Sequence, residues 1–122
     1  MDNRSKQILI ADDDAGIRLL LRRVVKDSGG RVVYSAESVE DIVNNESIDY
    51  GEIDIAIVDY KFEGYRTGID LANYLKDRGV KRIYLCTGYF DDENVIKSAQ
   101  KAGIDCIIPK PLDEAKLTNL LS

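Results

Sequence analysis

Short apolar runs alternate with longer amphipathic stretches along the whole chain. Each apolar run is four to six residues long, which is typical of strands buried on both faces of a sheet. After Ala15, five apolar positions fall at the spacing i, i+3, i+4, i+7 and i+8, which places them on one face of a helix. The predicted strands are residues 7–11, 31–35, 53–58, 82–87 and 106–109, and the predicted helices are residues 15–28, 36–45, 67–79, 91–103 and 112–121.

The order of these elements predicts an α/β fold. Strand alternates with helix five times, so the chain should form βαβ units with a parallel sheet covered on both faces. Right-handed crossovers leave few topologies, and five units of this size favour an open, doubly wound sheet. Pro109 has no N–H to donate, which suits an edge strand. The 122 residues fit one domain, residues 1–122, with no long linker and no internal repeat.

Composition narrows the classes of function. The net charge of −5 argues against nucleic-acid binding by this domain itself, since phosphate contacts need a basic face. No apolar run reaches membrane-spanning length, and we expect a cytoplasmic protein without a membrane contact. Cys86 and Cys106 lie in apolar runs and are expected to be buried, reduced thiols, with a disulfide as the less favoured alternative. The chain has no histidine, so any chemistry that needs an imidazole must take it from a partner.

Charged and hydroxyl side chains follow four of the five predicted strands, at the point where each strand ends. Function in open α/β sheets is found outside these carboxyl ends, so the side chains are expected to converge on one edge of the sheet. Each has an ordinary explanation when taken alone, as a helix cap, a turn residue or a solvated lysine. Their coincidence at one edge instead favours a functional site. The groups are the Asp12–Asp14 run, Asp59, Thr87 and Lys110.

The chemistry of such a site follows from its charges. Several carboxylates at one edge need a cation, and ligand sets made only of oxygen suit a hard divalent ion such as Mg²⁺. A carboxylate beside such an ion can act as a nucleophile toward phosphorus. Phosphoryl transfer needs mainly positioning and charge neutralisation, which a metal, a lysine and a hydroxyl group can provide. Asp14 is expected to stand apart from this chemistry, as the N-cap of the first helix.

The segments "ILIADDD", "IAIVDY", "LCTG" and "PKP", in this order and spacing, resemble the receiver domain of bacterial response regulators. The resemblance covers essentially the whole chain. It implies a flavodoxin-like (βα)5 fold, a three-layer αβα arrangement around a five-stranded parallel sheet. The implied strand order is 2-1-3-4-5, which the family shares with flavodoxin.

The resemblance also implies roles for the acidic residues. Asp59 matches the phosphoacceptor of the family. Asp12 and Asp13 match its acidic pair, with Asp13 as a direct ligand of Mg²⁺ and Asp12 acting partly through water. The main-chain carbonyl of Lys61 matches the third protein ligand of the metal.

Two further residues match the family's coupling groups. Thr87 matches the hydroxyl that moves toward the phosphoryl group, and Lys110 matches the lysine that pairs with it. In the family the lysine–proline bond is cis, so Lys110–Pro111 is expected to be cis. The resemblance implies a sensor histidine kinase or a histidine phosphotransfer protein as the phosphoryl donor. We expect a signalling switch and not an enzyme, as a monomer or weak homodimer, with a protein target that the sequence does not name.

The chain departs from the family at several positions. Ile107 stands where the family usually has an aromatic residue that swings inward on activation. Phe62-Glu63 replaces a common methionine–proline pair, and the loop to Gly68 looks one residue longer than usual, as in some receivers attached to hybrid sensor kinases. In the family, the side chains two residues after the phosphoacceptor and two residues after the threonine flank the path of the attacking water. These positions match Lys61 and Tyr89, both long, so the resemblance implies a long-lived phosphoryl group.

Three other classes of protein remain open on the sequence alone. Asp12 and Asp14 form a D-x-D after a strand, as in small haloacid-dehalogenase phosphatases, although Gly16 stands where a threonine is expected and no cap domain fits. A flavodoxin would need a hydroxyl- and glycine-rich first loop, where three aspartates would repel a phosphate. A degenerate receiver could act only as a binding module, but it would not be expected to keep Asp59, Thr87 and Lys110.

Overall fold

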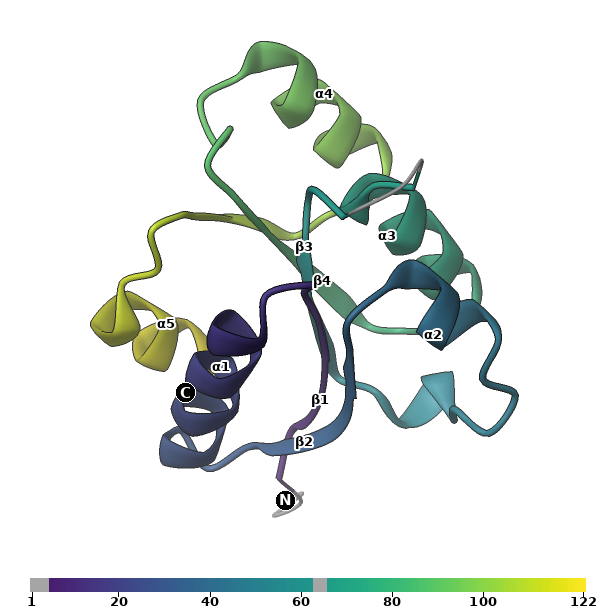
Figure 1. Ribbon diagram of the computed structural model, residues 1–122, viewed down its shortest axis with the longest axis vertical. Coiled ribbons are helices and arrows are strands. Elements are labelled where there is room, and N and C mark those ends of the chain that lie inside the picture. The colour runs from purple at the N-terminus through teal and green to yellow at the C-terminus, as the bar shows by residue number, and fades with distance from the viewer. Residues whose placement is uncertain (1–4, 63–65) are drawn as a thin grey trace.

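The protein is a three-layer α/β domain, seen in a computed structural model that describes residues 5–62 and 66–122 (Figure 1). All strand pairs of its five-stranded sheet are parallel, and the order β2-β1-β3-β4-β5 confirms the predicted topology. The elements are β1 (Gln7–Ala11), α1 (Ala15–Asp27), β2 (Arg31–Ala36), α2 (Val39–Val43), the 3-10 helix η1 (Tyr50–Glu52), β3 (Ile55–Asp59), α3 (Gly68–Asp77), β4 (Arg82–Thr87), α4 (Glu93–Lys101), β5 (Cys106–Pro109) and α5 (Glu114–Leu121).

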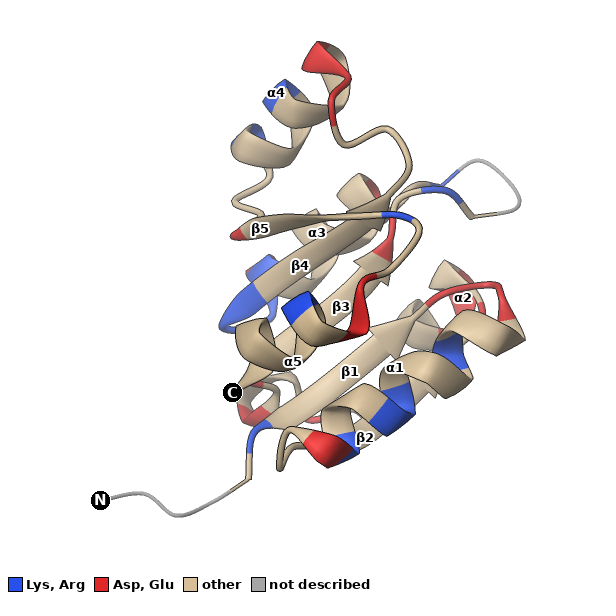
Figure 2. Ribbon diagram, turned by 90° about the vertical axis from the view of Figure 1, so that its left-hand side faces the viewer, with Lys and Arg blue, Asp and Glu red and all other residues tan. Residues whose placement is uncertain are grey.

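Helices cover both faces of the sheet. Figure 2 shows α1 and α5 on one face, with α3 on the other. Alternate residues of a strand therefore enter different cores: Ile8 and Ile10 pack with α1 and α5, whereas Leu9 packs with α2, α3 and α4. Each fully buried side chain of this kind stabilises the fold by roughly 1.5–3 kcal/mol. The continuous apolar runs in the sequence are thus explained by burial on both faces.

Local sequence explains where the helices begin and end. The Asp14 carboxylate caps α1 by accepting hydrogen bonds from the N–H groups of Gly16 and Ile17, as predicted. At its other end α1 stops at Gly29, which has a φ of 85° that other residues rarely adopt. Gly68 starts α3 for a steric reason, because a Cβ there would lie 2.1 Å from the main-chain oxygen of Asp59.

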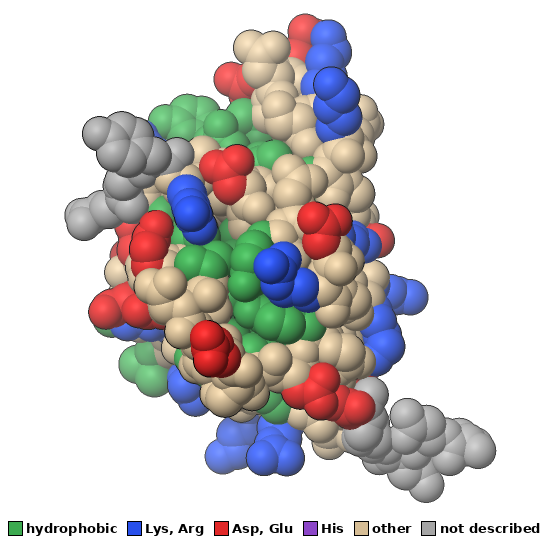
Figure 3. Space-filling view, turned by 90° about the vertical axis from the view of Figure 1, so that its right-hand side faces the viewer, with side chains coloured by type: hydrophobic (Ala, Val, Ile, Leu, Met, Phe, Trp, Pro, Cys, Tyr) green, Lys and Arg blue, Asp and Glu red, His purple; other side chains and the backbone are tan. Residues whose placement is uncertain are grey.

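Aromatic side chains gather on the side of the molecule that carries α2 and α3. Figure 3 shows hydrophobic side chains at the centre of this face, with acidic and basic side chains around them. The rings of Tyr50 and Tyr74 meet edge to face with centroids 6.0 Å apart, and the guanidinium of Arg78 lies 3.4 Å from the Tyr74 centroid. Burial, reinforced by the Tyr74 hydroxyl, raises the pKa of Tyr50 to about 12. These contacts fasten the segment after α2 to α3.

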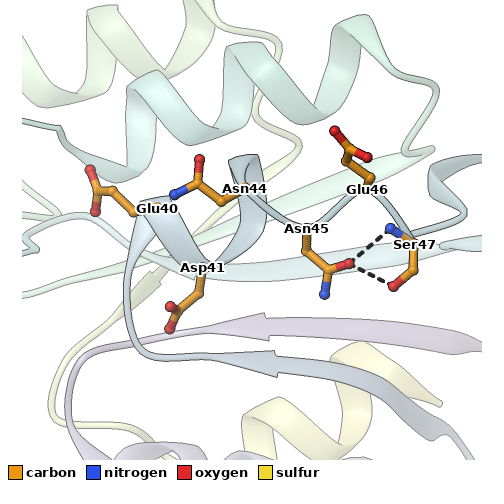
Figure 4. A pocket seen from close by; sticks show the side chains of 6 residues that line it. All are labelled: Glu40, Asp41, Asn44, Asn45, Glu46 and Ser47. Atoms are coloured by element: carbon orange, nitrogen blue, oxygen red, sulfur yellow. Dashed lines mark hydrogen bonds between the residues drawn. The ribbon is translucent and has the colours of Figure 1, made fainter.

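The second helix is shorter than predicted, spanning Val39–Val43 instead of residues 36–45. Its start is fixed by Ser38, whose hydroxyl accepts a hydrogen bond from the third residue of the helix. Beyond its end, the Asn45 side chain accepts hydrogen bonds from the N–H and the hydroxyl of Ser47, at 2.8 and 2.6 Å (Figure 4). Such a turn competes with helix formation, so the chain leaves the helix early and then forms the unpredicted η1.

Smaller differences occur at other boundaries. The third strand spans Ile55–Asp59 instead of residues 53–58, so Asp59 itself belongs to the strand. The fourth and fifth helices begin two residues later than predicted, because Asp92 and Asp113 act as N-caps and are not helical. Pro109 ends β5 at the edge of the sheet, as expected.

Candidate functional site

The residues singled out in the sequence lie at the carboxyl ends of the strands, along one edge of the sheet. Asp12 and Asp13 follow β1, and Asp59 is the last residue of β3. One carboxylate oxygen from each of these three residues lies within 4.8 Å of the others. Thr87 ends β4 and is buried. The structure therefore brings the three predicted acidic ligands into one cluster.

A single lysine reaches into this cluster from the end of β5. The ammonium of Lys110 lies 3.1 Å from Oδ2 of Asp12 and 3.0 Å from Oδ1 of Asp59. The bond between Lys110 and Pro111 is cis, as predicted. Asp12 and Asp59 are both buried, while the Lys110 side chain keeps partial access to solvent. One ammonium group thus pairs with two buried carboxylates, and the Asp13 carboxylate lies close to both of them.

The electrostatics of the cluster show that negative charge is in excess. Burial raises the pKa of Asp59, and the neighbouring charge of Asp12 raises this pKa further. A hydrogen bond and the charge of Lys110, together with a main-chain hydrogen bond from Lys61, oppose the rise without cancelling it. Burial lowers the pKa of Lys110, but the hydrogen bond to Asp59 and the charges of both carboxylates outweigh this and raise it overall. An added cation would relieve the remaining repulsion.

Asp12 is held by hydrogen bonds on every side. Its N–H donates to the carbonyl of Ala36 in β2, at 3.0 Å. Its Oδ1 accepts from the N–H of Asp14 at 2.9 Å, and its main-chain oxygen accepts from Nη1 of Arg18 at 2.7 Å. With the Lys110 contact to Oδ2, all of its polar atoms are engaged. These hydrogen bonds therefore fix the position of Asp12 in the site.

Asp13 lacks the burial and the side-chain hydrogen bonds that hold Asp12. It is exposed, and its carboxylate accepts no hydrogen bond from the residues that the structure describes. Its oxygens nevertheless lie close to those of Asp12 and Asp59. The arrangement leaves the Asp13 carboxylate available to a cation, in agreement with the ligand role expected for it.

Sequence reasoning missed Arg18. The only signal for it was its spacing, four residues after the cap residue Asp14 and so one turn into the first helix. A side chain at that position can reach back over the loop that precedes the helix. The hydrogen bond to the Asp12 carbonyl could not be predicted from spacing alone.

The two residues expected to flank the phosphoryl group line one cavity. Lys61 and Tyr89 both border this cavity, whose volume is about 370 Å³. The Tyr89 ring is 48 % exposed and meets the Tyr60 ring edge to face, with centroids 6.1 Å apart. Its N–H donates to the Thr87 hydroxyl oxygen at 2.9 Å. Their expected roles, including the Lys61 carbonyl as a metal ligand, stay predictions.

The departures from the family pattern fall in different environments. Ile107 is half-buried and packs against the core on the side of α3 and α4. Phe62 is buried in the same core. Glu63 and the extra loop residue that was predicted before Gly68 lie outside the described residues.

The cysteines take no part in the site. Cys86 and Cys106 are both free thiols. Burial raises the pKa of the Cys86 thiol to about 12, so it stays protonated beside the acidic cluster. Cys86 is buried in the core, as expected, whereas Cys106 is only half-buried and packs against that core.

The phosphatase alternative is not favoured by this geometry. A D-x-D mechanism needs Asp12 and Asp14 to face the same substrate. The Asp14 carboxylate is instead occupied by the N–H groups that begin α1 and lies outside the acidic cluster. The acidic first loop is equally unlike a phosphate-binding loop of a flavodoxin.

Comparison with known proteins identifies relatives. Residues 8–122 match the family model described as the response regulator receiver domain. The chain is 27 % identical to chemotaxis protein CheY-3 of Vibrio cholerae over 98 % of its own length and 91 % of that protein. It is 28 % identical to the transcriptional regulatory protein PdtaR of Mycobacterium tuberculosis and 26 % identical to a cyclic di-GMP phosphodiesterase of Thermotoga maritima. It spans only 53 % and 27 % of those two proteins, against 92 % and 87 % of its own length.

Solved structures agree with the fold. The receiver domain of AraT, a response regulator from Geobacillus stearothermophilus, superposes with a TM-score of 0.79 at 25 % identity, covering 97 % of this chain and 91 % of that one. A BeF3-activated receiver domain of DrrB superposes with a TM-score of 0.80 at 22 % identity, covering 97 % and 95 %. Among the described residues, no helix is both long and apolar enough to cross a membrane. Response regulator receiver domains are signalling modules of two-component systems that interact with histidine kinases or phosphotransfer proteins, and the match over residues 8–122 shows that this chain belongs to that family.

Proposed function

We propose that this chain accepts a phosphoryl group on Asp59 from a partner phosphohistidine, with Mg²⁺ bound at the acidic cluster, and then changes conformation. The observation that carries the proposal is the cluster of Asp12, Asp13 and Asp59, in which the Lys110 ammonium contacts the carboxylates of Asp12 and Asp59. The absence of histidine from the chain agrees with a donor imidazole supplied by a sensor histidine kinase or a histidine phosphotransfer protein.

The residues of the cluster fit a hard divalent cation. The three carboxylates offer oxygen ligands only, which is the donor set that Mg²⁺ prefers. Asp13 would bind the ion directly, Asp12 would act partly through water, and the Lys61 carbonyl would complete the protein ligands. When bound, Mg²⁺ would neutralise charge on the phosphoryl oxygens.

The chain's own residues would carry out the transfer. A carboxylate oxygen of Asp59 attacks phosphorus while the bond from phosphorus to the donor imidazole nitrogen breaks, and the imidazole leaves with the electron pair of that bond. Lys110, already 3.0 Å from Asp59, pairs with the new phosphoryl oxygens. The Thr87 hydroxyl donates a hydrogen bond to the same group, which links the end of β4 to the phosphorylation state.

The proposal also covers the domain organisation, the cellular location and the partner of this chain. Residues 1–122 would act as a single receiver domain in the cytoplasm, as a monomer or a weak homodimer. The net charge of −5 supports a protein target and not nucleic acid as the direct partner of this domain. Ile107 cannot supply an aromatic ring to the conformational change, so the output surface would respond through other groups.

The test is phosphorylation by acetyl phosphate with Mg²⁺, followed by intact-mass analysis. The parent should gain one phosphoryl group, and Asp59→Asn should gain none. Asp91→Asn is a matched control, because Asp91 is an exposed aspartate in the loop after β4 and lies outside the cluster. It should be phosphorylated like the parent. A phosphoryl group mapped to Asp12 or Asp14, or no gain of mass in the parent, would show that the proposal is wrong.

A further inference from the structure

A basic side chain supports the acidic loop from the first helix. Nη1 of Arg18 donates a hydrogen bond of 2.7 Å to the main-chain oxygen of Asp12. Arg18 is half-buried, one turn beyond the cap residue Asp14. Its contact is with the backbone of the loop, whereas Lys110 contacts the carboxylates themselves. Arg18 and Lys110 therefore act on different parts of the cluster.

The bonded oxygen belongs to the peptide group that joins Asp12 to Asp13. A peptide group is planar, so holding its oxygen also fixes the direction of the N–H and Cα of the next residue. For Asp13 this constraint is important, because its carboxylate accepts no hydrogen bond from the described residues. The orientation of the Asp13 side chain thus depends on the backbone that Arg18 holds.

Two effects of Arg18 on a bound cation have opposite signs. As a positive charge near the cluster, Arg18 would repel Mg²⁺ and lower its affinity. As a clamp on the Asp12 carbonyl, it would keep Asp13 aimed at Asp59 and raise the affinity. Removing the side chain therefore distinguishes the two, since loss of a mere charge would tighten binding and loss of the clamp would weaken it.

We propose that Arg18 is a positioning residue for the cation site and that its hydrogen bond to the Asp12 carbonyl increases the affinity for Mg²⁺. The inference rests on the proposed function, because it assumes that Asp13 binds the ion. Groups that orient metal ligands commonly change affinity about 10–100-fold when they are removed. We expect the lower end of that range, about tenfold, because Asp14 also holds Asp12 through its N–H.

The experiment is a titration of the ¹⁵N-labelled protein with MgCl₂ alone, followed by NMR. Arg18→Gln should bind Mg²⁺ about tenfold more weakly than the parent. Arg18→Lys keeps the charge but lacks the planar fork of arginine, and it should also bind more weakly than the parent. Arg22→Gln is the matched control, since Arg22 is an exposed arginine one turn further along α1. It should bind at least as tightly as the parent.

A second measurement on the same samples requires no metal. Amide hydrogen exchange at Asp13 and Asp14 should be faster in Arg18→Gln than in the parent, because the loop has lost its clamp. Mg²⁺ binding by Arg18→Gln that equals or exceeds that of the parent would overturn the inference while leaving the proposed function intact. A parent that shows no Mg²⁺-dependent shifts would instead overturn the cation site itself, and this inference with it.

Discussion

The two ends of the sheet both carry aspartates, but they use them differently. At the amino end, Asp54 accepts a hydrogen bond of 2.7 Å from the N–H of Gln7 and lies 3.4 Å from the ammonium of Lys81. Asp105 likewise accepts a hydrogen bond of 2.8 Å from an N–H of β4 and lies 3.2 Å from the ammonium of Lys76. Each of these carboxylates has its own backbone donor and its own lysine.

At the carboxyl end two carboxylates share one lysine. Asp12 and Asp59 share Lys110, the Asp13 carboxylate lies beside them, and the pKa of Asp59 is raised, chiefly by burial. Carboxylates with their own partners tie strands together, whereas carboxylates that share a partner are left with capacity for a ligand. The difference between the two ends shows that a functional site is marked by incomplete charge compensation more than by the residue types present.

The largest difference should appear when each end loses a lysine. Lys110→Ala leaves buried carboxylates without their cation and should lower the free energy of unfolding by about 3 kcal/mol in the absence of Mg²⁺. Lys81→Ala removes a partner from a more exposed pair and should cost less than about 1 kcal/mol. Urea denaturation without added metal measures both. Equal losses would mean that the two ends do not differ in the way described.

Mg²⁺ should stabilise the carboxyl end only. A ligand that binds the folded state at ten times its dissociation constant adds about 1.4 kcal/mol, because it does not bind the unfolded chain. Asp13→Asn should remove most of the Mg²⁺-dependent rise in Tm, whereas Asp105→Asn, at the other end, should keep the rise. Thermal melts with and without MgCl₂ provide the measurement. A full Mg²⁺-dependent shift in Asp13→Asn would contradict the assignment of Asp13 as a ligand.

The carboxyl end should give stability a dependence on pH. The pKa of Asp59 is raised above its usual 3.8, so the folded chain holds this proton to higher pH than the unfolded chain does. Stability is therefore lost as the pH rises from the ordinary aspartate range through the raised pKa of Asp59. Without metal, Asp59→Asn should be more stable than the parent at neutral pH and should lose less stability over this rise.

Asp54→Asn is the counterpart of this variant at the amino end. It weakens the charge-assisted hydrogen bond from Gln7 and should be less stable than the parent at neutral pH. Denaturation curves recorded between pH 4 and pH 7.5 compare the two. If Asp59→Asn were less stable than Asp54→Asn, the repulsion inferred at the carboxyl end would be absent.

The smallest effect concerns the lifetime of the phosphoryl group. Lys61 and Tyr89 line the same cavity, and we predict that both take up space that an attacking water would need. The double variant Lys61→Asn with Tyr89→Glu should lose its phosphoryl group severalfold faster than the parent. A tenfold change would correspond to about 1.4 kcal/mol of the barrier. First-order dephosphorylation in Mg²⁺ is the measurement, and an unchanged rate would exclude steric shielding by these side chains.

Periodicity predicted the strands, the helices and the parallel α/β class, whereas the strand order was implied by the family resemblance. The five strands were recognisable because burial on both faces demands continuous apolar runs, and the glycine after α1 marked its end. The second helix was overestimated because its limits depend on side-chain hydrogen bonds of Ser38 and Asn45 that compete with the helix. Such local competition has no periodic signal.

The site was predictable to the extent that it depends on strand ends. Parallel strands place their carboxyl ends at one edge, so the grouping of Asp12, Asp13 and Asp59 followed from topology. The bond from Arg18 and the packing of Tyr89 against Tyr60 did not follow, because long side chains take their direction from packing between elements.

The contacts of Lys110 also have a consequence for how the protein folds and unfolds. The lysine is separated from Asp12 by 98 residues and from Asp59 by 51 residues along the chain. The site is therefore built from long-range pairings, which form late because each closes a large loop. A cation that recognises only the finished site cannot accelerate the search for it. It should instead lower the rate of unfolding, so that a bound cation also makes the native chain kinetically more stable.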